Sequence, residues 1–157
     1  MKVVPAIKVR NAQRSVRVQL RELQRFSERA LQLALLSPTR TRSELRDMGE
    51  ITVALISDRR MAALHRRFMD LEGATDVITF QHGDIFVSVE TAQRNGAQFG
   101  TSTEKEIKLY IVHGFLHLHG FDDTTPAESR LMKETQKRIL AAAQKASAKE
   151  QRARAAV

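Results

Sequence analysis

Two histidines four residues apart are the feature of this sequence whose spacing could do chemistry most directly. His113 and His117 stand in the run IVHGFLHLHGFDD. On a helix, residues four apart project from one face, so both ring nitrogens can reach one metal ion at about 2.0–2.1 Å. Gly120 can end that helix and turn the chain back, after which Asp122 or Asp123 can supply a third ligand. Two histidines and one carboxylate leave a coordination position open, as in catalytic zinc sites.

The residue after the first histidine indicates what such a site would not do. Zinc peptidases of the His-Glu-x-x-His type carry their general base at that position. Here the position is Gly114, which has no side chain to take a proton from water. The sequence therefore argues for water activated by the metal itself, attacking something other than a peptide.

The remaining histidines lack this spacing. His119 lies off the face that His113 and His117 share, so we expect it at the surface or in contact with a ligand. His65 and His82 have no partner at a metal-binding spacing, and we assign them no role in the site.

Hydrophobic periodicity predicts the elements that must position these residues. Strands are expected at residues 3–9, 51–56, 76–80 and 83–88. Helices are expected at residues 16–36, 58–68, 89–98, 102–118 and from 126 onward. Strands and helices interleave, which predicts one α+β (mixed α/β) domain. Its sheet would have about four strands packed with about five helices, and the metal site would lie at the end of a helix.

Length and composition bound the class of protein. The chain has 157 residues, 26 Lys and Arg against 18 Asp and Glu, and no cysteine. This length suffices for one domain with its own core. Without cysteine, a disulfide framework, a Cys-ligated metal site and thiol catalysis are excluded. No apolar run approaches the roughly 18–20 residues of a membrane span, and no secretory signal is visible, so we expect a cytoplasmic protein with no membrane partner.

Charge is distributed unevenly along the chain. Residues 1–46 hold 11 basic and 3 acidic side chains, residues 47–125 hold 7 and 12, and residues 126–157 hold 8 and 3. Basic flanks around an acidic middle suggest a polyanionic partner held by the flanks, although charge alone fits a solvated surface equally well. We predict a single domain over residues 1–145. The Ala-rich basic tail, residues 146–157, offers little to a core and is predicted to be frayed or disordered.

At the histidine motif the sequence resembles the YbeY family of bacterial metal-dependent endoribonucleases, whose signature is His-Gly-x-Leu-His-Leu-x-Gly-Tyr-Asp-His. The matching residues are His113, Gly114, Leu116, His117, Leu118, Gly120 and Asp122, with Phe121 a near match. A second block, EGATDVITF at 72–80, resembles the family's Asp-x-Pro-Thr-Asp-Val-Leu-Ser-Phe, and GDIFVSVETA at 83–92 resembles the segment that follows it. Two motifs in the right order make the resemblance specific, and it covers roughly residues 47–140.

The resemblance implies an endoribonuclease specific for single-stranded RNA, acting in ribosomal RNA maturation and 70S ribosome quality control with one zinc ion. The family's third histidine falls on Asp123, so the implied ligands are His113, His117 and Asp123. Asp122 is expected to orient this site from just outside the ligands. Nickel and manganese stay open as alternatives to zinc. The implied partners are single-stranded RNA, ribosomal RNA and the ribosome, while the oligomeric state stays open.

A second departure concerns an arginine that is thought to serve catalysis in the family's Tyr-Arg-x-x-Asp segment. The matching residues here are Phe68 and Met69. Arg66 and Arg67 stand just upstream, and one of them would supply the cation for the phosphate from a displaced position. The basic flanks would hold the RNA backbone, without individual residues being assigned. Aromatic residues are only 5% of the chain, so we do not expect extensive base stacking.

Two other functions stay open. A non-catalytic, ribosome-associated metal-binding protein fits the departures at Asp123 and Met69. A metallopeptidase shares the two-histidine helix, but Gly114 counts against it. Ribosome binding that survives loss of both histidines, without nuclease activity in the wild type, favours the first of these. Cleavage of peptides but not of RNA favours the second.

Overall fold

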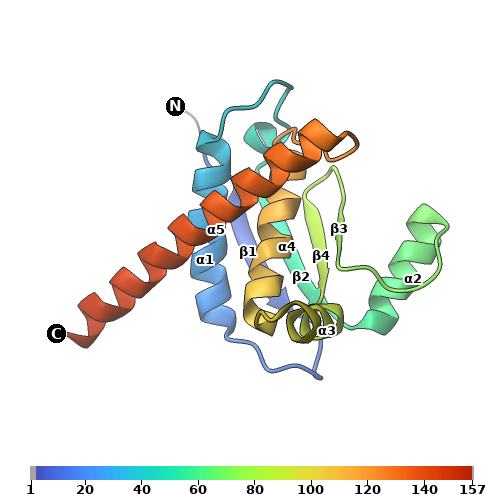
Figure 1. Cartoon of the computed structure of the whole chain (residues 1–157), viewed down its shortest axis with the longest axis horizontal. Helices are drawn as coiled ribbons and strands as arrows, with labels where there is room; N and C mark the ends of the chain where they lie inside the picture. Colours follow the sequence, from blue (N-terminus) through green and yellow to red (C-terminus); the bar gives the residue numbers. More distant parts are fainter. Residues whose placement is uncertain (1–2, 157) are drawn as a thin grey trace.

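A four-stranded mixed sheet forms the centre of the computed structural model, which describes residues 3–156 (Figure 1). Its strands are β1 (Ala6–Asn11), β2 (Glu50–Ile56), β3 (Val77–Thr79) and β4 (Asp84–Ser88). The order is β1-β2-β4-β3, with β1 parallel to β2, β2 parallel to β4, and β3 antiparallel to β4. In β2, Ile51, Val53 and Leu55 alternate into the main core, while Ile56 enters a second, smaller cluster.

Five α-helices surround the sheet within residues 3–156. They are α1 (Leu20–Leu36), α2 (Asp58–Met69), α3 (Val89–Phe99), α4 (Thr103–Leu118) and α5 (Pro126–Ala155), and a short 3₁₀ turn, η1 (Leu45–Asp47), precedes β2. The central helix, α4, contacts α1, α3, α5, β3 and β4, and it is buried around most of its circumference. This is the predicted α+β domain with four strands and five helices. No helix in the described part of the chain is both long and apolar enough to span a membrane.

The N-terminal elements begin later than the periodicity predicted. β1 begins at Ala6 rather than Val3, and α1 begins at Leu20 rather than Val16. The loop before α1 is held by Gln13, whose side chain accepts a hydrogen bond from Val16 N and donates one to Val16 O. Val16 therefore packs against the core from a loop that mimics the spacing of the helix.

α2 covers the opposite face of the sheet with its first turns only. Ser57 caps it by accepting a hydrogen bond from Arg60 N, and Met61 is buried against the sheet as expected. Phe68, which we expected on the same buried face, is 54% exposed. The reason is visible in Figure 1, where the last turns of α2 extend away from the sheet.

The C-terminal tail departs from the fraying we expected, because α5 continues as one helix to Ala155. Its composition of Ala, Lys, Arg, Gln and Glu is strongly helix-forming. Arg29 of α1 also ties it down, donating from Nε to Ala143 O (3.1 Å) and pairing with Glu150 (3.2 Å). The helix crosses the body of the protein, and its last turns project beyond it (Figure 1).

Candidate metal centre

Three potential ligands converge at the C-terminal end of α4. His113 and His117 come from its last turns, and Asp123 comes from the loop between α4 and α5. The two Nε2 atoms are 2.9 Å apart, and His113 Nε2 is 3.9 Å from Asp123 Oδ2. All three ligand atoms lie within 4.8 Å of one another. Ligands 2.0–2.1 Å from a tetrahedral ion are roughly 3.3 Å apart, so this donor set fits one zinc-sized ion.

A tight turn after α4 brings Asp123 back toward the histidines. Gly120 has φ 101°, its N–H donates to His117 O (3.1 Å), and the N–H of Phe121 donates to Leu116 O (2.9 Å). This pair of bonds is the Schellman helix ending, which needs a left-handed residue and favours glycine there. A Cβ at Gly120 would overlap Thr41 Oγ1, so the close approach of this loop also requires glycine.

Asp122 acts on the backbone of this loop. One of its carboxylate oxygens accepts a hydrogen bond from Asp123 N (2.8 Å). Thr125 then caps α5 by accepting from Glu128 N. The loop is thus fixed at both ends, while the Asp123 side chain remains 44% exposed and leaves the cluster open to solvent.

Gln136 of α5 is a site residue that sequence reasoning missed. Its Oε1 lies 2.8 Å from His113 Nδ1, and the residue is buried. With the amide oxygen accepting, Nδ1 carries the proton and Nε2 directs its lone pair toward the other two donors. The available signal was a polar residue inside the apolar stripe that Met132 and Ile139 form on α5.

The environment of His117 favours the neutral ring that a metal requires. Burial lowers the pKa of His117, and the neighbouring His113 lowers it further. The carboxylates of Asp123 and Asp122 act in the opposite direction without reversing the shift. These effects together favour the neutral imidazole, which is the form that can coordinate a metal ion.

His119 has a different place from the one we expected. It is fully buried, with Nε2 2.8 Å from Ser37 O and Nδ1 2.7 Å from Ser43 Oγ. Because a carbonyl only accepts, Nε2 carries the proton and Nδ1 accepts from the Ser43 hydroxyl. Burial lowers the pKa of His119, Ser37 O opposes this shift, and Arg46 reinforces it. His119 thus fastens the loop after α1 to the end of α4.

The other two histidines lie outside the cluster, as expected. His65 Nδ1 bonds Gly73 O at 2.9 Å, and His82 Nε2 lies 2.7 Å from Asp84 Oδ2. Each contact is local in the chain and partly exposed to solvent.

Gly114 lies where α4 approaches the sheet most closely. A Cβ there would be 2.9 Å from Ile85 Cδ1 and 3.1 Å from Thr79 Oγ1. There is no room for the glutamate that a His-Glu-x-x-His peptidase carries at this position.

Arg66 and Arg67 lie at the far end of α2. Both are exposed, and the guanidinium of Arg67 is 5.3 Å from the ring centroid of Phe68. No hydrogen bond or ion pair in residues 3–156 joins either arginine to the three converging ligands. In Figure 1 this end of α2 stands apart from the end of α4. Their displaced catalytic role therefore stays a prediction.

Comparison with known proteins agrees with both sequence motifs. The family model described as Endoribonuclease YbeY matches residues 8–144. Proteins named Endoribonuclease YbeY from Bacteroides thetaiotaomicron and Bacteroides fragilis are 35% and 36% identical over 101 residues, which cover 60% of this chain and 74% and 73% of theirs. A protein of the same name from Frankia alni is 34% identical over 114 residues, covering 60% of this chain and 63% of its own.

A solved structure shares the fold. The solution structure of TM1509 from Thermotoga maritima superposes with a TM-score of 0.63 and 23% identity, covering 92% of this chain and 93% of that one. The family match spans most of the chain and includes the strand block, the histidine helix and the loop that follows it. The chain therefore belongs to the YbeY family, the family described as Endoribonuclease YbeY.

Proposed function

We propose that this protein is a metal-dependent endoribonuclease that cleaves single-stranded RNA in ribosomal RNA maturation and 70S ribosome quality control. The observation that carries the proposal is the convergence of His113, His117 and Asp123, within 4.8 Å, in a chain of the YbeY family. One zinc ion is the proposed cofactor, because nitrogen and carboxylate donors in a small cluster suit it. The proposed location is the cytoplasm, where bacterial ribosomal RNA is processed.

Each protein group has a defined task in this proposal. When bound, a metal ion supplies a Lewis acid for the phosphodiester and acidifies water. Gln136 fixes the His113 ring, and Asp122 holds the backbone that carries Asp123. The exposed side of the cluster leaves room for an RNA strand to approach.

A cation from α2 completes the proposed chemistry. A guanidinium near the phosphate offsets the negative charge that develops as the bond breaks. Arg66 and Arg67 are exposed, and no carboxylate within residues 3–156 forms an ion pair with either. One of them is proposed for this role, reaching the RNA from an end of α2 that stands apart from the three converging side chains, and the other offers a matched comparison in single Arg→Gln variants.

Metal analysis of protein purified without added metal, followed by RNA cleavage with and without chelator, tests the proposal. We expect about one zinc per chain and cleavage of single-stranded RNA that stops with chelator and returns with zinc. RNA cleavage that continues unchanged in metal-depleted protein contradicts it.

The same preparations separate the alternatives. Cleavage of unstructured peptides without cleavage of RNA would indicate a peptidase, against which the packing at Gly114 argues. Ribosome binding that persists when His113 and His117 are replaced, with no nuclease activity in the wild type, would indicate a non-catalytic ribosome-associated protein.

A further inference from the structure

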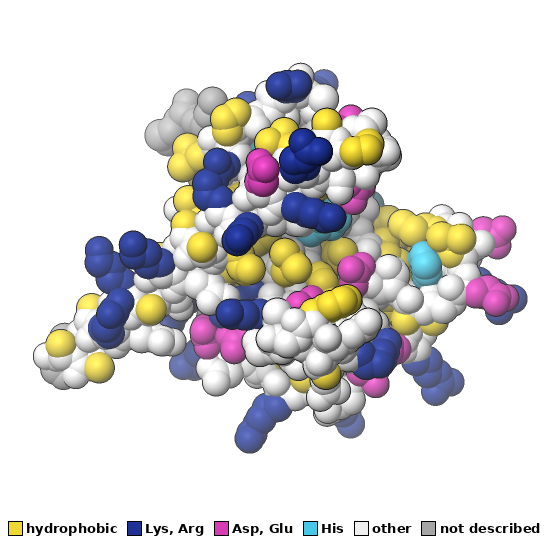
Figure 2. All heavy atoms as spheres, in the orientation of Figure 1, with side chains coloured by type: hydrophobic (Ala, Val, Ile, Leu, Met, Phe, Trp, Pro, Cys, Tyr) yellow, Lys and Arg dark blue, Asp and Glu magenta, His cyan; other side chains and the backbone are white. Residues whose placement is uncertain are grey.

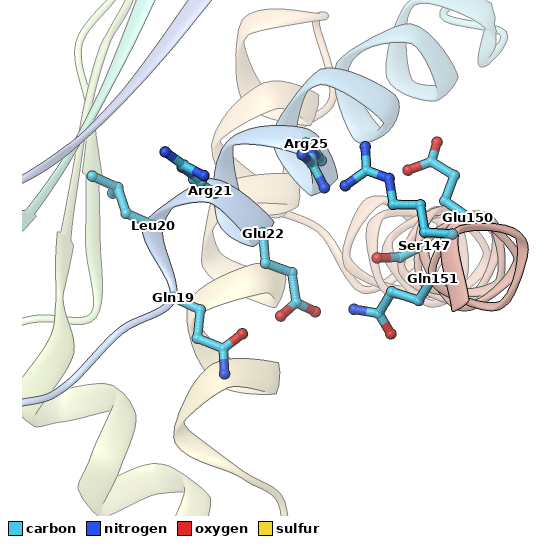
Figure 3. Close-up of a pocket in the computed structure, with 9 residues that line it drawn as sticks. Gln19, Leu20, Arg21, Glu22, Arg25, Ser147, Glu150 and Gln151 are labelled. Carbon is cyan, nitrogen blue, oxygen red and sulfur yellow. The ribbon is translucent and has the colours of Figure 1, made fainter. Parts of the chain in front are cut away.

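A hollow of about 480 Å³ lies away from the metal cluster, between the first turns of α1 and the last turns of α5 (Figure 3). Its lining includes arginines from both helices together with amide and hydroxyl groups. These polar residues are Arg21, Arg25, Arg154, Gln19, Gln151 and Ser147. We refer to this feature as the α1/α5 groove.

The two acids that also line the groove are matched by cations of the protein itself. Glu150 pairs with Arg29 at 3.2 Å. Glu22 lies 3.5 Å from Lys108, whose side chain is only 6% exposed and which also pairs with Glu104. The negative charge in the groove is therefore partly neutralised from within.

The groove arginines have no such internal partner. No carboxylate in the described part of the chain forms an ion pair with Arg21, Arg25 or Arg154. Three arginines line the groove against two carboxylates that already pair with other cations, so the lining carries a surplus of positive charge. The net charge of this surface therefore favours a polyanion.

We propose that the α1/α5 groove binds the backbone of single-stranded RNA at a distance from the site of cleavage. Arginine presents a planar fork of donors that suits phosphate oxygens, and amide and hydroxyl groups supplement it in contacts to phosphate and sugar. The groove unites the two basic flanks of the sequence, because α1 and α5 pack side by side. This inference rests on the RNA substrate of the proposed function.

The outer face of α5 connects the groove to the metal cluster. Gln136, which contacts His113, precedes Ser147 and Arg154 by 11 and 18 residues, or about 16 and 27 Å along the helix. The exposed basic residues beside Gln136 are Arg130, Lys133, Lys137 and Arg138. Figure 2 shows Lys and Arg side chains along the length of α5. A strand held at the cluster can thus follow this helix to the groove.

A triple variant with a matched control tests the inference. The test variant carries Arg21→Gln, Arg25→Gln and Arg154→Gln. The control removes the same charge from exposed positions outside the groove, by Lys8→Gln, Arg10→Gln and Arg59→Gln. Binding of a labelled single-stranded 20-mer and of a 6-mer is measured with chelator present, from 50 to 200 mM salt.

We expect the groove variant to bind the 20-mer about tenfold more weakly at 100 mM salt. Its slope of log K against log salt should fall by about 2, since each lost phosphate contact contributes roughly 0.7 for single strands. The 6-mer should bind as to wild type, and the control should change little. With metal present, KM for the 20-mer should rise while kcat stays unchanged.

Equal weakening by the groove variant and the control, or no weakening by either, overturns the inference. The same holds if the groove variant loses binding of an acidic peptide but keeps binding of RNA. Because binding is measured without turnover, an absence of cleavage in the wild type counts against the proposed function and leaves the groove to be decided by the binding data. If the triple variant does not fold, Arg154→Gln alone, on the exposed end of α5, is measured in its place.

Discussion

The hydrogen bond between Gln136 and His113 determines which nitrogen of His113 faces His117 and Asp123. Imidazole has two ring nitrogens, and an acceptor at Nδ1 places the proton there. The 2.8 Å contact to the buried amide oxygen thus leaves the lone pair of Nε2 free to accept a metal ion. Such contacts behind a ligand commonly change metal affinity by 10–100-fold when removed.

Gln136→Met should therefore bind zinc about 10–100-fold more weakly, because Met fills a similar volume without the acceptor. Gln136→Glu keeps an oxygen at this position and should restore most of the affinity. Competition with a fluorescent chelator measures both variants. Wild-type affinity in Gln136→Met would show that the ring is oriented by other contacts.

Asp58 joins α2 to the neighbouring elements through its carboxylate. Burial would raise the pKa of Asp58, but hydrogen bonds from Arg94, Ser88 and Thr91 and the charge of Arg94 outweigh burial and lower it below its ordinary value. A carboxyl with a lowered pKa in the folded state contributes stability above its unfolded pKa of about 3.9. That contribution is lost as the pH falls through the lower folded pKa.

Asp58→Asn should accordingly be less stable than wild type at pH 7, by about 1–2 kcal/mol for the lost charge-assisted bonds. The difference in free energy of unfolding between the variant and the wild type should become smaller as the pH falls below about 4, where Asp58 of the unfolded wild type takes up a proton. Urea unfolding from pH 7 to pH 3 measures it. A gap that stays constant over this range would contradict the assignment.

For individual residues, the sequence predicted contacts between residues that lie close together in the chain. The proximity of His113 and His117 was predictable because a helix places residues four apart on one face. Gln136 was not, since its contact with His113 spans 23 residues and depends on how α5 packs. The predicted position of His119 was wrong for the same reason, because its hydrogen-bond partners Ser37 and Ser43 belong to a loop that is distant in the sequence.

Among the elements, the turn between α4 and α5 has the most direct effect on the site. Gly120 ends α4 with φ 101° and passes close to Thr41 and Arg42. Gly100 ends α3 with a similar positive φ of 71° but has open space where a Cβ would lie. Comparing substitutions at Gly120 and Gly100 therefore distinguishes the effect of a strained backbone from the effect of steric crowding.

Gly120→Ala should lower the free energy of unfolding by about 2–4 kcal/mol, from a strained φ together with overlap in a packed loop. It should also weaken metal binding, since Asp123 follows the turn. Gly100→Ala should cost only about 1 kcal/mol and leave metal binding unchanged. Urea unfolding and zinc titration of both variants test this. Equal effects of the two substitutions on metal binding would contradict the positioning role of the turn.

The types of the helices and strands were largely predictable, but their first and last residues were not always predictable. The alternation in β2 and the apolar sequence of α4 identified the sheet and the buried helix. The predicted first residue of α1 was wrong because the side chain of Gln13 stabilises a loop there, which hydrophobic periodicity does not detect. The end of α2 was predicted within one residue, but the expected burial of Phe68 was wrong, because amphipathic spacing does not reveal that the last turns of the helix extend away from the sheet.

For the molecule as a whole, the fold shows where the basic segments of the sequence lie in space. The two basic flanks of the sequence become α1 and α5, which pack together, while the candidate metal ligands lie at the end of α4. Sequence alone could not place the flanks side by side. The tail beyond residue 145 contributes charge rather than core, since no residue of α5 after Ala143 is buried.

Deletion of residues 146–157 should therefore change the free energy of unfolding by less than about 1 kcal/mol, because the Arg29–Glu150 pair is partly exposed and such pairs contribute little. Urea unfolding of the truncated and full chains measures it. A loss of several kcal/mol would show that the domain does not end near residue 145.

The central claim is that the histidine cluster holds the metal on which RNA cleavage depends. It is tested most directly by His117→Ala, with bound zinc, far-UV circular dichroism and cleavage of single-stranded RNA measured on the same sample. We predict a wild-type spectrum, loss of the zinc found in the wild type, and at least a hundredfold loss of cleavage, in line with removal of a major catalytic group. Cleavage at the wild-type rate by the folded, zinc-free variant would contradict the account.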